Sequence, residues 1–176
     1  MRIVSGSHRG RAIEPPRGFR ARPTTDFAKE NIFNVLSNLY DFDGLEVLDL
    51  FSGTGSISYE FASRGAARVV SVEADRMHRS FIETTARKMG LTAVESLLGD
   101  AFGFVRYCSD KFDIVFADPP YDMEGTEELP DIVTDRVLRP EGIFVLEHSK
   151  QMSFENHPRF TQHRSYGSVN FSIFEP

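Results

Sequence analysis

The stretch FDIVFADPPY, residues 112–121, places four residues that could act on an amino group at the end of an apolar run. Residues 114–117 are Ile-Val-Phe-Ala, a run typical of a strand buried on both faces of a parallel sheet. Pro119 and Pro120 cannot continue the strand, because each lacks an N–H donor and has a fixed φ. We therefore expect Asp118 on a stiff ledge at the carboxyl end of the strand, where open α/β sheets bind ligands.

The chemistry that suits this ledge is activation of an aromatic amine. Such an amine is a poor nucleophile, because its lone pair is delocalised into the ring. The Asp118 carboxylate and the Pro119 carbonyl could accept its two hydrogens and favour a pyramidal nitrogen, while Tyr121 could stack on the ring. We predict a catalytic site formed by Asp118, Pro119, Pro120 and Tyr121. On these residues alone, an ordinary Asp-Pro turn is the alternative.

Short apolar runs and helical patterns alternate along the chain after Gly44. Strands are expected at residues 47–51, 69–73, 95–98, 112–117 and 143–147, and helices at 57–63, 76–89, 102–107 and 128–138. A further helix should begin after Thr25, which can serve as its N-cap. This alternation predicts an α/β fold, a Rossmann-like doubly wound and mostly parallel sheet with helices on both faces.

The two ends of the chain depart from this alternation. Residues 159–174 predict two strands joined by a Tyr-Gly-Ser turn, so the sheet should finish in an antiparallel hairpin. Near the start, RIVSG and RGRAIEPP predict two short strands around a turn, a small basic β-hairpin arm. We therefore divide the chain into a basic arm at residues 1–24 and a catalytic domain at residues 25–176.

Four acids stand at or just after the ends of the first four expected strands, namely Asp49, Glu73, Asp100 and Asp118. The carboxyl ends of parallel strands meet at one edge of a sheet, so the four carboxylates should surround one crevice. Any one of them could be an ordinary turn residue or helix cap. Their equivalent positions favour a shared ligand site.

A crevice surrounded by carboxylates repels a pyrophosphate, since like unit charges about 4 Å apart interact by about 4 kcal/mol at an effective dielectric near 20. NAD and ATP are therefore disfavoured. A cofactor with ribose hydroxyls and positive charge is favoured, and S-adenosylmethionine carries an ammonium and a sulfonium. Glu73 suits the ribose diol, Asp49 the ammonium and Asp100 the adenine amino group.

Two glycines in LDLFSGTG, Gly53 and Gly55, would let the backbone approach the cofactor at the start of a helix. A Gly-x-Gly alone is a weak signal, and Ser58 stands where a dinucleotide fingerprint has its third glycine. The predicted cofactor site comprises Asp49, Phe51, Gly53, Gly55, Glu73, Asp100 and Ala101.

The formal charge is unevenly distributed. Residues 1–22 hold six arginines and one glutamate, a net of +5, although the whole chain carries −6. A basic segment on an acidic body is typical of nucleic-acid binders, and a solvated tail is the alternative.

The motifs DLFSGTG, VEAD and DPPY, in this order, resemble class I S-adenosylmethionine-dependent methyltransferases that act on exocyclic amines. More narrowly, RIVSGSHRGR, RPTTD, FASRGA and YGSVNFSIF resemble the bacterial 16S ribosomal RNA guanine-N2 methyltransferases, and this resemblance extends from Arg2 to Phe174. It implies methylation of one guanine of the small subunit, with 16S ribosomal RNA bound in an assembly intermediate. It also implies RNA contacts by Arg9, Arg11, Arg20 and Arg22.

The chain departs from this family at Ser58, where glycine is usual, so the packing of the following helix on the sheet is in question. An adenine-N6 methyltransferase could use the same DPPY motif, but 176 residues leave little room for a separate target-recognition domain. A non-catalytic RNA-binding module on the same fold should have lost its cofactor residues, which are present here.

Residues 1–11 lack the apolar stretch of a secretory signal, and no run approaches the roughly 20 apolar residues of a membrane span. We expect a cytoplasmic monomer that does not associate with membranes. Cys108 is the single cysteine and the five histidines lack metal-ligand spacing, so we expect neither a disulfide within the chain nor a metal site.

Overall fold

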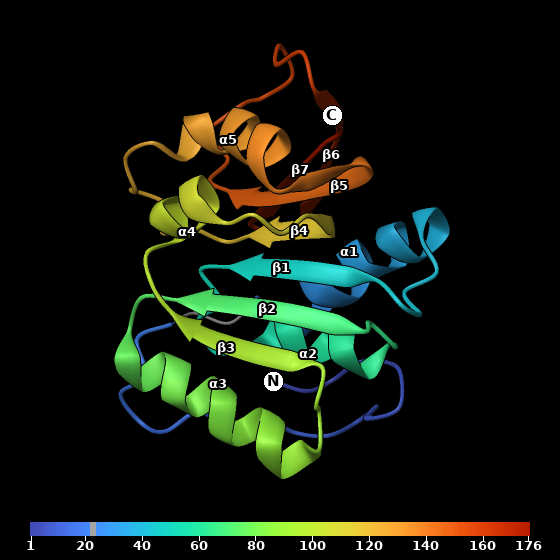
Figure 1. The fold of residues 1–176 in the computed structure, drawn as a ribbon, viewed down its shortest axis with the longest axis vertical. Coiled ribbons are helices and arrows are strands. Elements are labelled where there is room, and N and C mark those ends of the chain that lie inside the picture. Colours follow the sequence, from blue (N-terminus) through green and yellow to red (C-terminus); the bar gives the residue numbers. More distant parts are fainter. Residues whose placement is uncertain (22–23) are drawn as a thin grey trace.

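One mixed sheet of seven strands forms the centre of the molecule (Figure 1). The computed structural model describes residues 1–21 and 24–176. The strand order is β3-β2-β1-β4-β5-β7-β6, with β1 to β5 parallel and β7 antiparallel to both β5 and β6. The strands are β1 (Glu46–Leu50), β2 (Arg68–Glu73), β3 (Val94–Leu98), β4 (Phe112–Ala117), β5 (Leu138–His148), β6 (Phe160–Tyr166) and β7 (Val169–Phe174). The predicted doubly wound sheet with a closing hairpin is confirmed.

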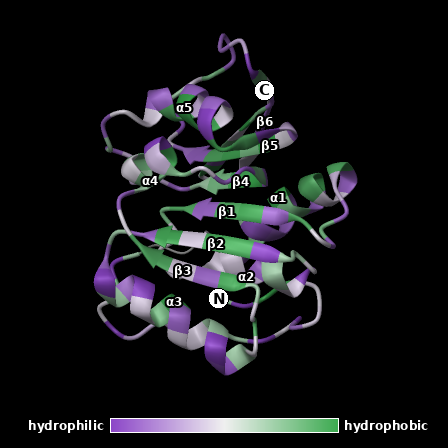
Figure 2. Ribbon diagram, in the orientation of Figure 1, coloured by the Kyte–Doolittle hydropathy of each residue, from purple (hydrophilic) through white to green (hydrophobic). Residues whose placement is uncertain are grey.

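Helices cover both faces of the sheet. They are α1 (Asp26–Leu39), α2 (Ser56–Ser63), α3 (Arg76–Met89), α4 (Ala101–Tyr107) and α5 (Leu129–Arg136), with a short 3₁₀ turn at Thr126–Glu128. Figure 2 shows the hydropathy expected of such layers, because the central strands are mostly hydrophobic while α3 is mostly hydrophilic. Within the described residues, no helix is long and apolar enough to span a membrane.

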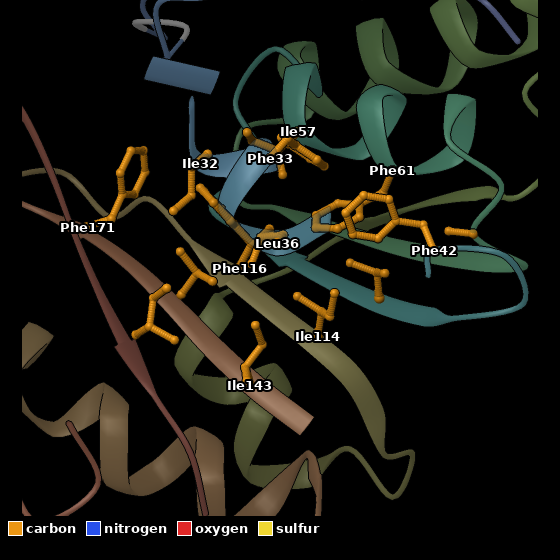
Figure 3. Close-up of a cluster of buried hydrophobic side chains, with 14 of the residues drawn as sticks. Ile32, Phe33, Leu36, Phe42, Ile57, Phe61, Ile114, Phe116, Ile143 and Phe171 are labelled. Carbon is orange, nitrogen blue, oxygen red and sulfur yellow. The ribbon is translucent and has the colours of Figure 1, made fainter. Parts of the chain in front are cut away.

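The two faces of the sheet form two separate apolar cores. On one face, side chains of α1 and α2 such as Phe33 and Phe61 pack against Ile114 and Phe116 of β4 (Figure 3). On the other face, α4 and α5 cover the alternate strand residues, among them Val115. This alternation explains why residues 114–117 of β4 are all apolar, since each face of this part of the strand lies under a helix.

The N-terminal segment, residues 1–21, is packed onto α2 and α3. Ile3 and Ile13 are buried beside Tyr59 of α2 and Ile82 of α3. Its two halves pair through three backbone hydrogen bonds and a single antiparallel bridge between Arg2 and Ala12, so the predicted short strands are reduced to that bridge. The backbone N–H groups of Arg2, Val4 and Ser5 donate to carboxylates of α1 and α2 instead of to the other half of the segment, which limits the pairing.

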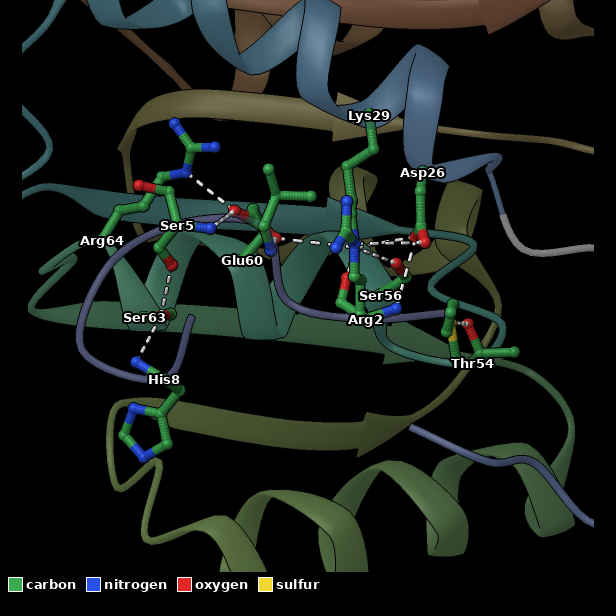
Figure 4. A network of polar contacts seen from close by, with 12 residues as sticks. Arg2, Ser5, His8, Asp26, Lys29, Thr54, Ser56, Glu60, Ser63 and Arg64 are labelled. Carbon is green, nitrogen blue, oxygen red and sulfur yellow. Dashed lines mark hydrogen bonds and ion pairs between the residues drawn. The ribbon is translucent and has the colours of Figure 1, made fainter. Parts of the chain in front are cut away.

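A buried charge network fixes this segment (Figure 4). The Glu60 carboxylate accepts the backbone N–H groups of Val4 (2.9 Å) and Ser5 (3.0 Å) and the Arg64 side chain (2.9 Å). Lys29 Nζ lies 3.5 Å from the same carboxylate and donates to the Arg2 carbonyl. Both Lys29 and Glu60 are fully buried, and desolvation lowers the pKa of Lys29.

Two boundaries of the predicted sheet strands and helices differ from the prediction by more than one residue. The helix expected at residues 128–138 ends at Arg136, and β5 begins at Leu138 instead of Ile143. Leu138 pairs with Phe112, and the register shifts before Ile114 pairs with Ile143. Pro140 and Gly142, which weaken a strand pattern, lie in this irregular part, so the sequence did not reveal it.

Candidate active site

Three acids stand at the same register position at the carboxyl ends of the parallel strands. Leu50 of β1 pairs with Val72 of β2 and with Ala117 of β4, and Ala117 pairs with Leu146 of β5. The next residue on each strand is Glu73 on β2, Asp118 on β4 and Glu147 on β5. Residues level in register share one face of a sheet, so these carboxylates point to the same side.

These acids line one cavity of about 670 Å³ at this edge of the sheet. Its walls are formed by the loop after β1, the starts of α3 and α4, the DPPY ledge (residues 118–121) and the turn between β6 and β7. A volume of this size is ordinary for a cofactor or small-molecule site. Of the predicted site residues, the lining includes Asp49, Phe51, Gly53, Glu73, Asp100, Ala101, Asp118, Pro119, Pro120, Tyr121 and Arg20.

Asp49 lies at the bottom of the cavity, almost fully buried. Its Oδ2 accepts a 2.6 Å hydrogen bond from the Ser58 hydroxyl. Burial raises the pKa of Asp49 to about 7, the Ser58 hydrogen bond opposes that rise, and the nearby Glu73 carboxylate adds to it. Ser58, the residue at which the chain departs from the family pattern, is a fully buried residue of α2, so the helix packs on the sheet with this hydroxyl bonded to the acid.

Replacing Asp49 by Asn should stabilise the protein more at pH 8 than at pH 5. A buried carboxyl with a raised pKa costs no stability while it is protonated in both states. Its penalty develops as pH rises from about 4, the unfolded pKa, to about 7, the folded pKa. Three pKa units correspond to at most about 4 kcal/mol. Denaturant unfolding of both proteins at the two pH values measures the effect; an equal difference at both would contradict the raised pKa.

Glu73 is held by the backbone of the loops around it. Its Oε2 accepts the Gly53 N–H at 2.7 Å, and its Oε1 accepts the Asp75 N–H at 2.8 Å. Each carboxylate oxygen has a second lone pair, so both can still accept from a ligand hydroxyl. Glu73 thus joins the loop after β1 to the start of α3.

The loop after β1 makes its sharp turn with left-handed backbone. Phe51 has φ of 59°, Gly53 of 56° and Gly55 of 81°. Gly53 lines the cavity, whereas the Cα of Gly55 faces away from it: a Cβ there would lie 2.6 Å from the Tyr59 ring and 3.0 Å from Ile82. Gly55 therefore permits the packing of α2 and α3, and of these two glycines it is Gly53 whose backbone borders the cavity.

Asp100 and Ala101 stand where α4 begins. Asp100 Oδ2 accepts the Gly103 N–H at 2.7 Å and caps the helix, while its side chain stays exposed at the cavity. Ala101 is buried beside it. Asp100 is therefore both a helix cap and a cavity residue, two roles that the sequence offered as alternatives.

Asp118 and Glu147 form a pair of carboxyls on adjacent strands. Desolvation raises the pKa of Asp118 well above its ordinary value, and repulsion from Glu147 and then Asp49 raises it further. Burial also raises the pKa of Glu147. Because the two carboxyls disfavour each other's charge, hydrogen-bond donors or cations bound between them would be stabilised.

Glu147 is anchored at both oxygens. Its Oε2 accepts from the Thr24 hydroxyl at 3.2 Å, and its Oε1 from the Tyr121 hydroxyl at 3.3 Å. Tyr121 is half exposed, so this bond holds its ring at the cavity mouth. Thr24 belongs to the RPTTD motif, and its contact joins that motif to the DPPY ledge.

The predicted arginines are not gathered at one place. Arg20 lines the cavity, and Phe19 before it stacks on His78 of α3 at 4.0 Å. Arg9 and Arg11 are exposed on the turn of the N-terminal segment, where His8 bonds to the Met89 carbonyl at the far end of α3. Fourteen helical residues span about 21 Å. Arg22 lies outside the described residues.

Among the residues that sequence reasoning missed, three bear directly on the acids of the site. Glu147 is the last residue of the strand predicted at residues 143–147, so the rule that found four acids at strand ends could have found a fifth. Ser58 was treated as a packing question, and its hydrogen bond to Asp49 has no signature in the sequence. Thr24 carried no signal beyond its motif.

Comparison with known proteins places the chain in a family. A family model described as "Conserved hypothetical protein 95" matches residues 1–175. The chain belongs to this family. The match includes the N-terminal segment as well as the sheet, so both are family features.

Relatives and solved structures agree with this assignment. The chain is 29% identical to "Putative rRNA methyltransferase YlbH" of Bacillus subtilis, over 99% of this chain and 98% of that protein. It is 29% identical to Ribosomal RNA small subunit methyltransferase D of Escherichia coli K12, over 99% and 89%. A hypothetical protein of Thermus thermophilus superposes with a TM-score of 0.86 at 26% identity, over 100% and 99%. An RNA methyltransferase of Salinibacter ruber, solved with S-adenosyl-L-homocysteine, shares the fold with a TM-score of 0.68 at 18% identity, over 87% and 92%.

Proposed function

We propose that this protein transfers a methyl group from S-adenosylmethionine to the exocyclic N2 amine of a guanine in 16S ribosomal RNA. The observation that carries the proposal is the row of carboxyls that continues, in one cavity, from Glu73 and Asp49 to Asp118 on the DPPY ledge. The names of the relatives support the same reaction class and the ribosomal substrate.

The residues of the first part of the cavity fit the cofactor. When bound, S-adenosylmethionine supplies a methyl group on a positively charged sulfur. Glu73, held by two backbone N–H groups, is the acceptor for the ribose hydroxyls, and Asp49 faces the ammonium. Phe51, Gly53, Asp100 and Ala101 complete this part of the lining. Gly55 contributes by setting the turn of the loop.

The second part presents the amine. Asp118 and the Pro119 carbonyl accept the two amine hydrogens, Pro120 keeps the ledge rigid, and Tyr121 stacks on the base. The nitrogen–carbon bond forms as the carbon–sulfur bond breaks, leaving S-adenosylhomocysteine, and the amine proton passes to Asp118 or to water. Positioning and electrostatics supply the rate enhancement.

The RNA is held by the basic N-terminal segment. We propose that Arg20 contacts phosphates beside the target base and that Arg9 and Arg11 contact RNA about 20 Å away. An RNA contact by Arg22 stays a prediction from the family resemblance. The basic arm predicted at residues 1–24, to which this segment belongs, acts as the RNA-contacting unit. The protein itself is a cytoplasmic monomer whose substrate is a small-subunit assembly intermediate.

Neutralising the arginines should separate these contacts. Arg20→Ala should raise the KM for any RNA substrate, whereas the Arg9→Ala, Arg11→Ala double variant should raise it for intact 16S RNA but not for a short hairpin around the target. Each lost phosphate contact should reduce the slope of log K against log salt by about 0.7–0.9. Arg136→Ala, an exposed arginine at the end of α5, is the control. Unchanged salt slopes would rule out phosphate binding by the segment.

The function is tested by offering labelled S-adenosylmethionine with small ribosomal subunits, naked 16S RNA and duplex DNA in parallel. Label in ribosomal RNA is expected, and the preferred particle identifies the assembly state that is used. Label found only in DNA would be consistent with amine methylation at the DPPY ledge, but it would overturn the proposal that RNA is the substrate.

A further inference from the structure

Glu147 is a buried acid that the proposed reaction does not yet use. It is 5% exposed and lines the cavity. Among the described residues, no lysine, arginine or histidine forms an ion pair with it. Burying an acid in a cavity without a cationic partner is costly, and such groups concentrate at functional sites.

The strand order fixes where Glu147 lies relative to the reaction. Of the acids assigned to the cofactor, Glu73 and Asp49 stand on β2 and β1, and Asp100 follows β3. Asp118 follows β4, and Glu147 stands on β5, one strand further from the cofactor acids. Neighbouring strands are about 4.8 Å apart. A base whose amine is bound by Asp118 can therefore be oriented with the adjoining edge of its ring within reach of Glu147.

Hydrogen bonding at that edge distinguishes the bases. Guanine presents an N1–H donor next to its N2 amine. Adenine presents a bare N1 acceptor next to its amine, which would meet a carboxylate lone pair. The two oxygens of Glu147 are anchored by Thr24 and Tyr121, yet each has a second lone pair for a donor.

We propose that Glu147 is a specificity-determining residue that accepts the N1–H of the target guanine while Asp118 accepts from its N2 amine. The inference rests on the proposed guanine methylation and deepens it. A target base drawn out of the RNA stack exposes this edge fully, so that both acids can reach it.

The test compares two RNA substrates that differ at the target nucleotide. One carries guanosine and the other 2-aminopurine riboside, which keeps the 2-amino group but has a bare N1. Wild type should prefer guanosine, and Glu147→Gln should reduce that preference, expressed as a ratio of kcat/KM values, by about tenfold or more, because its amide can face a bare N1. Comparing ratios cancels the intrinsic reactivity of the two amines.

Three controls separate reading of the base from support of the fold. Thr24→Val removes one anchor of the carboxylate and should lower kcat/KM for both substrates by the same factor. Glu147→Asp keeps the charge and should keep the guanosine preference at a lower rate. Affinity for S-adenosylhomocysteine, measured by calorimetry, should change less than about twofold in Glu147→Gln, which also shows that the variant folds.

The outcomes are distinct. A preference lowered in Glu147→Gln and kept in Glu147→Asp supports the proposal. An equal loss on both substrates in Glu147→Gln would show that Glu147 only supports the ledge and would overturn it. A wild-type enzyme that methylates neither substrate, nor intact 16S RNA, would overturn the proposed function itself.

Discussion

Asp118→Ala is expected to lower kcat by about 10² to 10³ while leaving affinity for S-adenosylhomocysteine nearly unchanged. The reason is that Asp118 faces the amine from β4, whereas the cofactor contacts come from β1, β2 and the start of α4. Loss of one preorganised polar group at a reacting centre has effects of this size. Single-turnover methyl transfer and calorimetry measure the two quantities on the same preparation.

A matched control for this variant is Asp113→Ala. Asp113 lies on the same strand but at its opposite half, where it pairs with Arg139 at 2.7 Å, away from the cavity. That variant should keep kcat within about twofold. Near-normal turnover in Asp118→Ala would remove the proposed role of the ledge. An equal loss of cofactor affinity would place Asp118 in the cofactor site instead.

Glu60→Ala is expected to lower the free energy of unfolding by about 3 to 5 kcal/mol, the usual cost of breaking a buried charge pair. It leaves Lys29 charged and buried, and it removes the acceptor of the Val4 and Ser5 backbone N–H groups. Urea unfolding measures the loss. Hydrogen exchange should show the increase in exchange concentrated at residues 3–13, because these depend on the network.

Two further variants make this prediction specific. Replacing Lys29 and Glu60 together by Met should cost less than Glu60→Ala, since it does not leave the Lys29 ammonium buried without its Glu60 partner. Glu83→Ala breaks the exposed pairs of Glu83 with Arg79 and Arg87 on α3 and should cost less than about 1 kcal/mol. Similar losses at Glu60 and Glu83 would contradict the view that the buried network secures the N-terminal segment.

Features that repeat along the chain could be predicted from the sequence. The apolar run of β4, the proline stop after it and the acid at each strand end follow from steric and polar rules that act locally. They predicted the parallel sheet, and the cavity contains all four of the predicted acids. These rules could not predict where β5 begins. Pro140 and Gly142 obscure the strand pattern there, and the start of β5 depends on its pairing with β4.

Contacts between distant residues were beyond prediction from local patterns. The bond from Thr24 to Glu147 spans 123 positions, and the bond from Val4 to Glu60 spans 56. The charge asymmetry indicated a basic segment but not its course, which places Arg20 at the cavity and Arg9 near the far end of α3. Such arrangements depend on packing of Ile3 and Ile13, which the net charge does not report.

The central claim is that the carboxyl row delivers a methyl group to guanine N2. The most direct measurement is mass spectrometry of nucleosides from unmodified 16S RNA or small subunits after incubation with S-adenosylmethionine and either wild type or Asp118→Ala. We predict N2-methylguanosine approaching one per RNA molecule with wild type and little product with the variant. Formation of N6-methyladenosine, or of equal N2-methylguanosine with both proteins, would contradict the account.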